Sequence, residues 1–447
     1  MDADALVEFF HCGYIYEDKT LFRDIRKVGP ATVLRSDSSG IVDALPKPIR
    51  DISEPTPRTF DSLIQDFILA VQNERVSVDI TGGADSRLLA AALAYFDLPF
   101  EMATSGRAGV PDFEIGAKVA EALDRPFFPT YHSADRSDWD ALFFLNEGLF
   151  DVMKNSRFVQ LLQDRKSRGV TLAVSGVCGE IFTDCFWMQD FPLYAGRKPR
   201  IERYFSMRMH PNAFDHELLV DPYRQCSYGL RKRLLQRVSR FAVPSNTRSY
   251  DRFYYYFQLP PYAGGFVTSG ANFVKVAAPY VDQEVSSIGF NLPPRKRILS
   301  RFHRGQITRY SPKAARLPST EGGATLRSGA AAMSANMGKF LADRAERLRI
   351  KLGQRFLAKG LKAPADDPKS VEELVRTMRH RRSTEVLADC GVIRAAIEPR
   401  SLPESYLGRV FVLGRIFEEL ENSDRAAENI RLRDYDTARQ QNVVSEA

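Results

Sequence analysis

Val76–Arg87, with the sequence VSVDITGGADSR, is the stretch that decides the fold. Its first five residues, Val76–Ile80, are mostly β-branched and predict a strand, whereas the Leu- and Ala-rich segment Arg87–Tyr95 predicts a helix. Between them lies a polar loop with two glycines, Thr81–Ser86. A glycine loop between a strand and a helix is typical of an α/β protein that holds an anion at the amino end of the helix.

Strands and helices are predicted to alternate around this loop. A helix is expected over residues 60–73, and the elements expected afterwards are strand Phe100–Thr104, helix Asp112–Leu123, strand Phe127–Tyr131 and strand Thr171–Val174. This alternation predicts an α/β fold with a parallel, doubly wound sheet. Ligands of such sheets lie at the carboxyl ends of strands, where Gly176 starts a second glycine loop.

The flanking regions have different patterns. Residues 1–50 are expected to form short strands and turns, including a strand at Thr32–Leu34. The aromatic run Phe253–Phe257 is expected to lie in the core of a helical region, or alternatively to line a substrate pocket. The chain is therefore expected to divide into residues 1–50, a central domain over 51–330, a helical part over 331–425 and a flexible tail over 426–447.

The composition is that of an ordinary globular protein. Of the 447 residues, 44% are hydrophobic and 27% are charged. No apolar run reaches transmembrane length and the first residues lack a signal-peptide pattern, so we expect a cytoplasmic protein without a membrane partner. The five cysteines are scattered and form no CxxC pair, which argues against a disulfide framework or a structural zinc site.

The net charge of +7 comes largely from residues 301–400, which are rich in Lys and Arg. We favour a solvated helix surface as the explanation, and the alternative is a surface for a polyanion such as nucleic acid. No oligomeric state is predicted.

The loop Thr81–Ser86 has the groups that a nucleotide requires. Its glycines let backbone amides approach an anion, and Thr81 and Ser86 add hydroxyl donors. Asp85 would repel a bare phosphate, so its presence indicates a hard cation such as Mg²⁺ between carboxylate and phosphate. We therefore expect Mg-ATP, and the alternative is a polar turn without a ligand.

The same loop resembles the SGGxDS signature of the ATP pyrophosphatases, with Thr81 in place of the first serine. Further segments resemble the asparagine synthetase branch, which includes β-lactam synthetases and lasso-peptide cyclases. Residues 13–30 resemble the end of its glutaminase domain, Ser175–Glu180 resembles its SG(D/E)GAD motif, and Pro279–Asp282 resembles its PFLD segment. The resemblance implies a fold of the PP-loop type.

The resemblance also implies roles for individual residues. Asp85 and Glu180 would bind Mg²⁺ and act in catalysis together with Arg316, which lies where the family has a phosphate-binding lysine. The alternative for Glu180 is capping of a helix that starts at Ile181. ATP would contact Thr81, Gly82, Gly83, Asp85, Ser86, Arg87, Thr104 and Gly176.

The chain also departs from this family. The glutaminase domain is nearly all missing and no cysteine follows Met1, so we expect no hydrolysis of glutamine. Val177 replaces the acid or tyrosine that handles the attacking amine, Cys178 replaces a glycine, and Lys275 stands where a glutamate is common. These changes concern the second substrate more than ATP. His303 is a candidate base, although a surface position is the expected alternative.

The leading functional prediction is an ATP-dependent, AMP-forming ligase that adenylates a carboxylate and transfers it to an amine or ammonia. One alternative is an ATP pyrophosphatase that modifies RNA, which the basic residues of the C-terminal third favour. Another is a degenerate relative that binds nucleotide without turnover, which Val177 and Cys178 favour.

Overall fold

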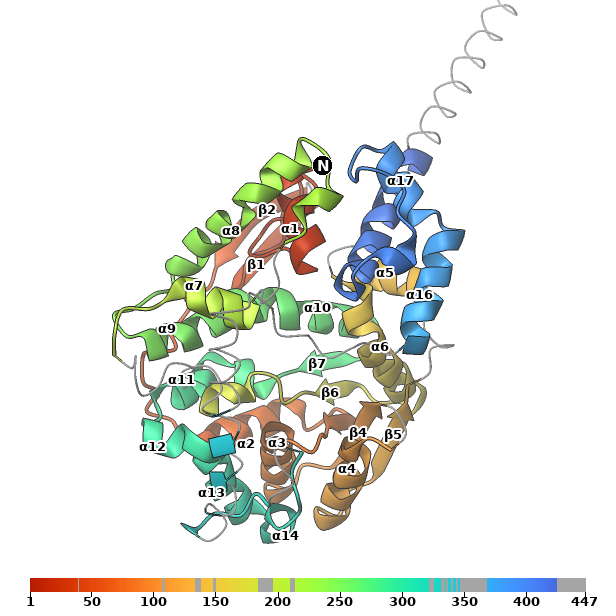
Figure 1. Ribbon diagram of the computed structural model, residues 1–447. Coiled ribbons are helices and arrows are strands. Elements are labelled where there is room, and N and C mark those ends of the chain that lie inside the picture. Colours follow the sequence, from red (N-terminus) through yellow and green to blue (C-terminus); the bar gives the residue numbers. More distant parts are fainter. Residues whose placement is uncertain are drawn as a thin grey trace, which may run out of the picture.

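The protein is an α/β protein with a central five-stranded parallel sheet (Figure 1). A computed structural model describes residues 1–38, 40–106, 109–132, 138–147, 150–183, 196–209, 214–320, 325–330 and 368–423, with a few helical positions between 331 and 345. The predicted tail over 426–447 lies outside the described residues.

The strand order in the central sheet is β5-β4-β3-β6-β7, and all neighbouring strands are parallel. The chain runs outward from β3 to β5 and then returns to β6 on the other side of β3. The loops after β3 and β6 therefore start at adjacent positions on one edge of the sheet. The strands are β3 (Val76–Asp79), β4 (Phe100–Gly106), β5 (Phe127–Tyr131), β6 (Leu172–Val174) and β7 (Lys275–Ala277).

Helices cover both faces of this sheet (Figure 1). On one face lie α3 (Ala84–Tyr95), α4 (Pro111–Ala122) and α13 (Arg301–Tyr310), of which α3 contacts β3 and α4 contacts β4. On the other face α6 (Val152–Ser167) contacts β4 and α10 (Leu259–Ala271) contacts β7. Because helices cover both faces of the sheet, Val76–Val78 of β3 and all of β6 are buried.

The other helices complete the layers around the sheet. They are α2 (Phe60–Val71), α5 (Trp139–Leu145), α7 (Ile201–Tyr204), α8 (Tyr223–Ser239), α9 (Asn246–Arg252), α11 (Gln283–Asn291), α12 (Pro294–Arg297), α14 (Pro312–Ala315), α16 (Pro368–His380) and α17 (Ser383–Asp389). Residues 404–423 are also helical, so the expectation of a helical C-terminal region is confirmed. The aromatic run forms a buried π-helix over Phe253–Gln258.

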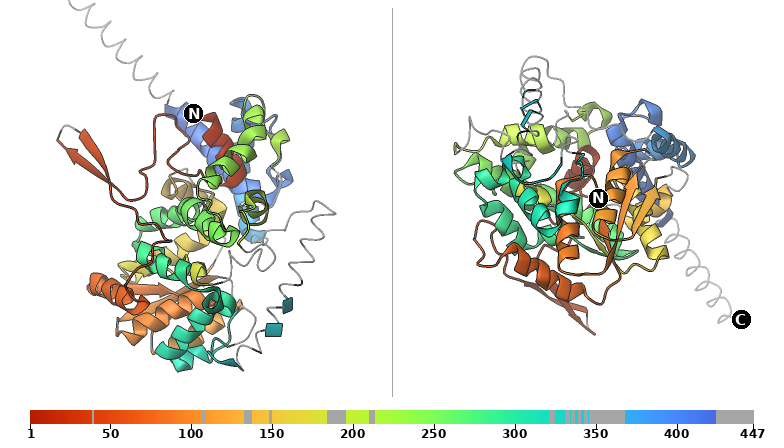
Figure 2. Two further views of the ribbon diagram at one scale, coloured as in Figure 1. Left: turned by 90° about the vertical axis from the view of Figure 1, so that its left-hand side faces the viewer. Right: turned by 90° about the horizontal axis from the view of Figure 1, so that it is seen from below.

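The N-terminal region differs from its prediction. A strand was expected at Thr32–Leu34 and is present in the hairpin of β1 (Thr32–Asp37) and β2 (Gly40–Pro46), which extends away from the body (Figure 2). The expectation of strands and turns is wrong for α1 (Ala3–Cys12), where Asp2 caps the helix. The polar residues of α1, Asp4, Glu8 and His11, lie at helical spacing and contact α8, so this period could have revealed the helix although the residues from Ala5 onward are buried.

One hydrophobic core extends through the parts that the sequence suggested as separate. It contains Ala5 of α1, Val78 of β3 and Ile416 near the end of the described chain. The expected boundaries at residues 50 and 330 therefore do not interrupt the core. Helix α1 packs against α8, and His11 Nδ1 lies 2.9 Å from the hydroxyl of Tyr406.

Several basic side chains of the C-terminal third are paired with acids. Arg381 contacts Asp140 at 2.7 Å, and Arg400 contacts Glu372 at 3.0 Å. The basic residues between 346 and 367 lie outside the described part. The cysteines described, Cys12, Cys178, Cys226 and Cys390, are free thiols. None of the described helices has the length and apolar character needed to cross a bilayer.

Candidate functional site

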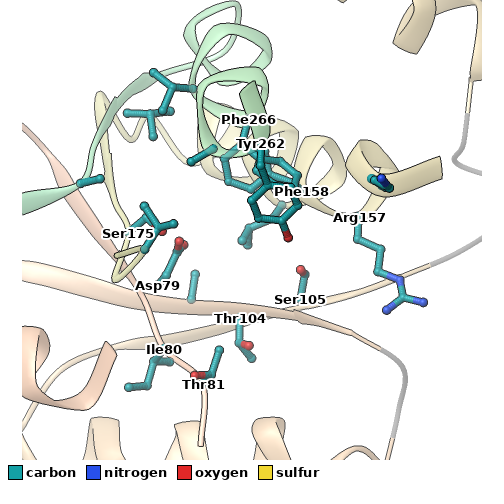
Figure 3. Close-up of a pocket in the computed structure, with 18 of the residues that line it drawn as sticks. Asp79, Ile80, Thr81, Thr104, Ser105, Arg157, Phe158, Ser175, Tyr262 and Phe266 are labelled. Carbon is teal, nitrogen blue, oxygen red and sulfur yellow. The ribbon is translucent and has the colours of Figure 1, made fainter. Parts of the chain in front are cut away.

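A cavity of about 400 Å³ opens at the carboxyl ends of β3, β4, β6 and β7, between the sheet and the helices α6 and α10 (Figure 3). Its floor is formed by polar strand ends, and its roof is aromatic and aliphatic. The lining residues are Asp79, Ile80, Thr81, Ala103, Thr104, Ser105, Lys154, Arg157, Phe158, Leu161, Ser175, Val177, Glu180, Tyr262, Ala263, Phe266, Val267, Val276 and Ala278.

The first glycine loop leads from β3 into α3 and is closed by its own side chains. The amide of Thr81 donates to Ser86 Oγ at 3.1 Å, and the amide of Gly83 donates to Thr81 Oγ1 at 3.3 Å. Gly83 is the N-cap of α3, which begins three residues earlier than predicted, at Ala84. The positive end of the helix dipole therefore lies within the loop.

Gly82 is held by two neighbours that the sequence did not suggest. Its amide donates to Asp112 Oδ1 at 2.7 Å, so a carboxylate from the start of α4 occupies one anion-binding position of the loop. A Cβ at Gly82 would lie 2.4 Å from Thr320 Cγ2, which explains the need for glycine. Thr320 also donates its amide to the carbonyl of Gly82 at 3.1 Å.

Arg87 faces away from the cavity. Its side chain is fully buried, and the guanidinium donates to the carbonyls of Gly82 at 3.3 Å and Pro318 at 2.6 Å. It also donates to Ala314 and Leu317, at 3.3 Å and 3.0 Å. Arg87, which was predicted to contact the nucleotide, therefore joins the loop to the segment that follows α14.

The second glycine loop, Ser175–Glu180, packs directly on the first. A Cβ at Gly176 would lie 3.1 Å from the amide nitrogen of Ser86, and a Cβ at Gly179 would lie 2.6 Å from Cβ of Asp85. Glycine at these positions is what allows the two loops to touch. The loops predicted from the sequence to share one edge of the sheet are therefore in contact.

Cys178 holds the second loop in an unusual conformation. Its φ is +75°, the left-handed region that favours glycine, and its side chain is fully buried. Burial raises the pKa of the Cys178 thiol well above its ordinary value. Burial therefore favours the protonated form of the Cys178 thiol.

Two carboxylates, those of Asp85 and Glu180, come together where the loops touch. Glu180 lines the cavity and accepts a hydrogen bond from the hydroxyl of Tyr254 at 3.3 Å. Burial raises the pKa of Glu180, and the negative charge of Asp85 raises it further, to about 7. The short 3₁₀ helix Gly179–Phe182 has Cys178 as its N-cap, with no side-chain cap bond, so Glu180 does not cap a helix starting at Ile181.

His303 also contacts this pair. Its Nε2 lies 2.8 Å from Asp85 Oδ1, and its side chain is fully buried near Phe182 and Tyr280. The expectation of a surface histidine is wrong, because α13 presents this side chain to α3 rather than to solvent. The helical spacing of His303 and Ile307 could have revealed that this face of α13 is buried, because Ile307 lies about one turn after His303 and is also buried.

The carboxylate pair suits a hydrated divalent cation. Asp85 Oδ1 faces His303 Nε2 on its buried side, and desolvation together with the charge of Asp85 raises the pKa of Glu180, so a cation between the two carboxylates would relieve their repulsion. No cluster of three or more His, Cys, Asp or Glu side chains suited to a metal is found in the described part of the chain. Mg²⁺ keeps several waters and needs only one or two carboxylates together with phosphates, so the residues present fit this ion.

The remaining predicted residues are divided between the cavity and other places. Thr104 lies in the cavity floor and Val177 in its wall. Arg316 is exposed at the end of α14 and does not line the cavity. Lys275 begins β7 and thus lies at the opposite edge of the sheet, where its Nζ contacts Glu74 at 2.5 Å. The association of Lys275 with the second substrate is therefore corrected.

Sequence reasoning missed several residues of the site. Asp79 ends β3 and lines the cavity, and the roof comes from α6 and α10. The contacts of Asp112 and Thr320 with Gly82 were also not foreseen. Asp79 could have been suspected, because a charged residue inside a buried strand is unusual.

Comparison with known proteins adds no assignment: no family model matches the chain, and no curated protein matches it.

Proposed function

We propose that this chain is an ATP-dependent, AMP-forming ligase with a doubly wound sheet of the PP-loop type. The carrying observation is the contact between the two glycine loops, which brings the carboxylates of Asp85 and Glu180 together beside the cavity. Two carboxylates, a helix amino end and glycine amides at the carboxyl edge of a parallel sheet suit a metal-bound polyphosphate.

The residues have distinct roles in this proposal. Asp85 and Glu180 hold the cation, and His303 keeps the Asp85 carboxylate in place from the buried side. Thr81, Gly83 and the amino end of α3 face the phosphates. Mg²⁺, when bound, neutralises the phosphates and assists the departure of pyrophosphate.

The reaction joins a carboxylate to an amine in two displacements. The carboxylate oxygen attacks the α-phosphate of ATP, and the bond to the β-phosphate breaks with release of pyrophosphate. The amine nitrogen then attacks the activated carbonyl carbon, loses a proton and displaces AMP. Donors and cations fixed before the reaction supply most of the stabilisation of the developing charge.

The loop Thr81–Ser86 must change its hydrogen bonds before a phosphate can bind to all of its amides. The Gly82 amide already donates to Asp112, so a phosphate oxygen at that amide displaces the Asp112 carboxylate. The same contact favours a second candidate function, that of a degenerate relative that binds nucleotide without turnover. The left-handed Cys178 in the second loop supports this alternative as well.

Pyrophosphate release tests the proposal. The protein is incubated with Mg-ATP and a panel of carboxylates and amines, and pyrophosphate and AMP are measured. Asp85→Asn should abolish release, because a neutral amide cannot balance the cation, while Asp389→Asn on the exposed face of α17 should leave it unchanged. Normal turnover of Asp85→Asn would contradict the assignment.

The alternatives give different results in the same assay. Nucleotide binding without pyrophosphate release from any pair of substrates would favour the degenerate relative. Tight RNA binding that weakens steeply with salt would favour the RNA-modifying pyrophosphatase.

A further inference from the structure

Asp79 is a charged residue of the cavity that the proposed reaction does not use. It is the last residue of β3, and its carboxylate points into the cavity beside Ser175 (Figure 3). Its side chain is 21% exposed, so the carboxylate is accessible to a ligand of modest size. Because side chains alternate along a strand, Ser77, Asp79 and Thr81 face the same side of the sheet.

A buried arginine fixes the orientation of this carboxylate. The side chain of Arg165 in α6 is completely buried, and its Nη2 lies 2.7 Å from Asp79 Oδ1. Its Nε donates to Ser77 Oγ at 2.9 Å. A buried ion pair adds little net stability, because desolvation offsets the attraction. Its clear consequence here is a carboxylate whose orientation is fixed from the buried side of the cavity.

The surroundings of Asp79 suit a nucleoside. On the floor, Thr104, Ser105 and Ser175 supply hydroxyl groups on both sides of Asp79 (Figure 3). In the roof, the ring of Phe266 makes edge contacts with Phe158, at 5.4 Å between centroids, and with Tyr262, at 5.2 Å. A flat base needs such an apolar aromatic wall, and a sugar needs hydrogen-bond acceptors.

The position along the strand identifies the part of the nucleotide that reaches Asp79. Two residues of extended chain, about 7 Å, separate Asp79 from Thr81, where the phosphate loop starts. A carboxylate repels phosphate at short range, so the neutral sugar is the part of ATP that can lie beside it. Ribose carries two adjacent hydroxyl donors, which match the acceptor oxygens of a fixed carboxylate.

We propose that Asp79, held by Arg165, accepts hydrogen bonds from the ribose hydroxyls of the nucleotide and thereby selects ribonucleotides over deoxyribonucleotides. The inference rests on the proposed function, because it requires ATP in this cavity. It assigns the aromatic roof to the base, the floor around Asp79 to the sugar and the glycine loops to the phosphates.

Binding of ATP, 2′-deoxy-ATP and 3′-deoxy-ATP to the unmodified protein is the first measurement, made by calorimetry with Mg²⁺. Loss of one hydrogen bond to a charged acceptor should weaken binding of at least one deoxynucleotide roughly 10- to 100-fold. This comparison needs no variant and cannot be affected by misfolding. Equal affinity for the three nucleotides would overturn the inference and leave the proposed function intact.

Asp79→Asn then tests whether this residue is the acceptor. The variant should bind ATP as weakly as the unmodified protein binds the discriminated deoxynucleotide, and its own preference for ribose should largely disappear. The substitution leaves Arg165 without its charged partner, so thermal unfolding of each variant is recorded, with Asp389→Asn on the exposed face of α17 as the matched control. Asp389→Asn should keep the preference.

Other outcomes separate the inference from the proposed function. If Asp79→Asn raises KM for the amine substrate while ATP affinity is unchanged, the carboxylate receives the amine and the ribose assignment is overturned. If the unmodified protein binds no adenine nucleotide, both the inference and the proposed function are overturned.

Discussion

Replacing Glu180 by glutamine should stabilise the free protein at pH 8 and change its stability little at pH 5. The pKa of this carboxyl is raised from 4.5 to about 7 by burial and by the charge of Asp85. A raised carboxyl pKa means that the folded state prefers the protonated form. The stability that this preference contributes is complete below pH 4.5 and is lost as the pH rises through 7.

The size of the effect follows from the pKa shift. One pH unit corresponds to about 1.4 kcal/mol, so a shift of this size corresponds to about 3 kcal/mol when the whole interval is crossed. Between pH 5 and pH 8 about 2 kcal/mol of this difference should be observed, because part of the interval lies below pH 5. Glutamine has nearly the same shape as glutamate and carries no charge. The variant therefore keeps the free energy of unfolding that the unmodified protein loses when Glu180 ionises.

Urea denaturation at pH 5 and pH 8 measures the difference for both proteins. Subtracting the free energy of unfolding of the unmodified protein from that of the variant at each pH removes the contribution of all other titrating groups. Glu121→Gln on the exposed face of α4 serves as the control and should show no pH-dependent gain. Stability curves of the Glu180→Gln and unmodified proteins that run parallel from pH 5 to pH 8 would refute the reasoning.

Two further predictions concern the loops. Arg87→Met should destabilise the protein by about 3–5 kcal/mol in urea denaturation, since it removes a buried guanidinium that donates to four carbonyls, whereas exposed Arg316→Met should change little. Gly179→Ala should strongly reduce Mg-ATP binding in calorimetry, because its Cβ would lie 2.6 Å from Asp85, while Gly264→Ala, with open space around it, should bind normally.

The sheet could be predicted from the sequence to the extent that its strands are buried. Strands β3 to β6 were expected within a few residues of their observed bounds, since each is a short apolar run next to a helical period. β7 was not expected, because its three residues, Lys275–Ala277, include a lysine and therefore form no apolar run. The contact of the two glycine loops followed from the rule that the carboxyl ends of parallel strands share one edge.

Side-chain direction was harder to predict than position. Arg87 belongs to the loop motif, yet the turn of α3 aims its guanidinium at carbonyls of residues 314–318, far along the chain. His303 stands between basic residues, yet its face of α13 is the one that meets α3. Such pairings depend on contacts distant in sequence, which a local pattern does not contain.

The burial of α1 has a consequence for synthesis of the chain. His11 meets Tyr406 across 395 residues, and the Arg409 guanidinium donates to the carbonyl of His11 at 2.6 Å. A ribosome adds about 5–20 residues per second, so the apolar first helix waits roughly 20–80 s for its C-terminal partners. During this interval the ring of Phe10 lacks its contact with Tyr406, and a chain that stops before residue 406 never acquires it. Chains that stop early should therefore aggregate through α1.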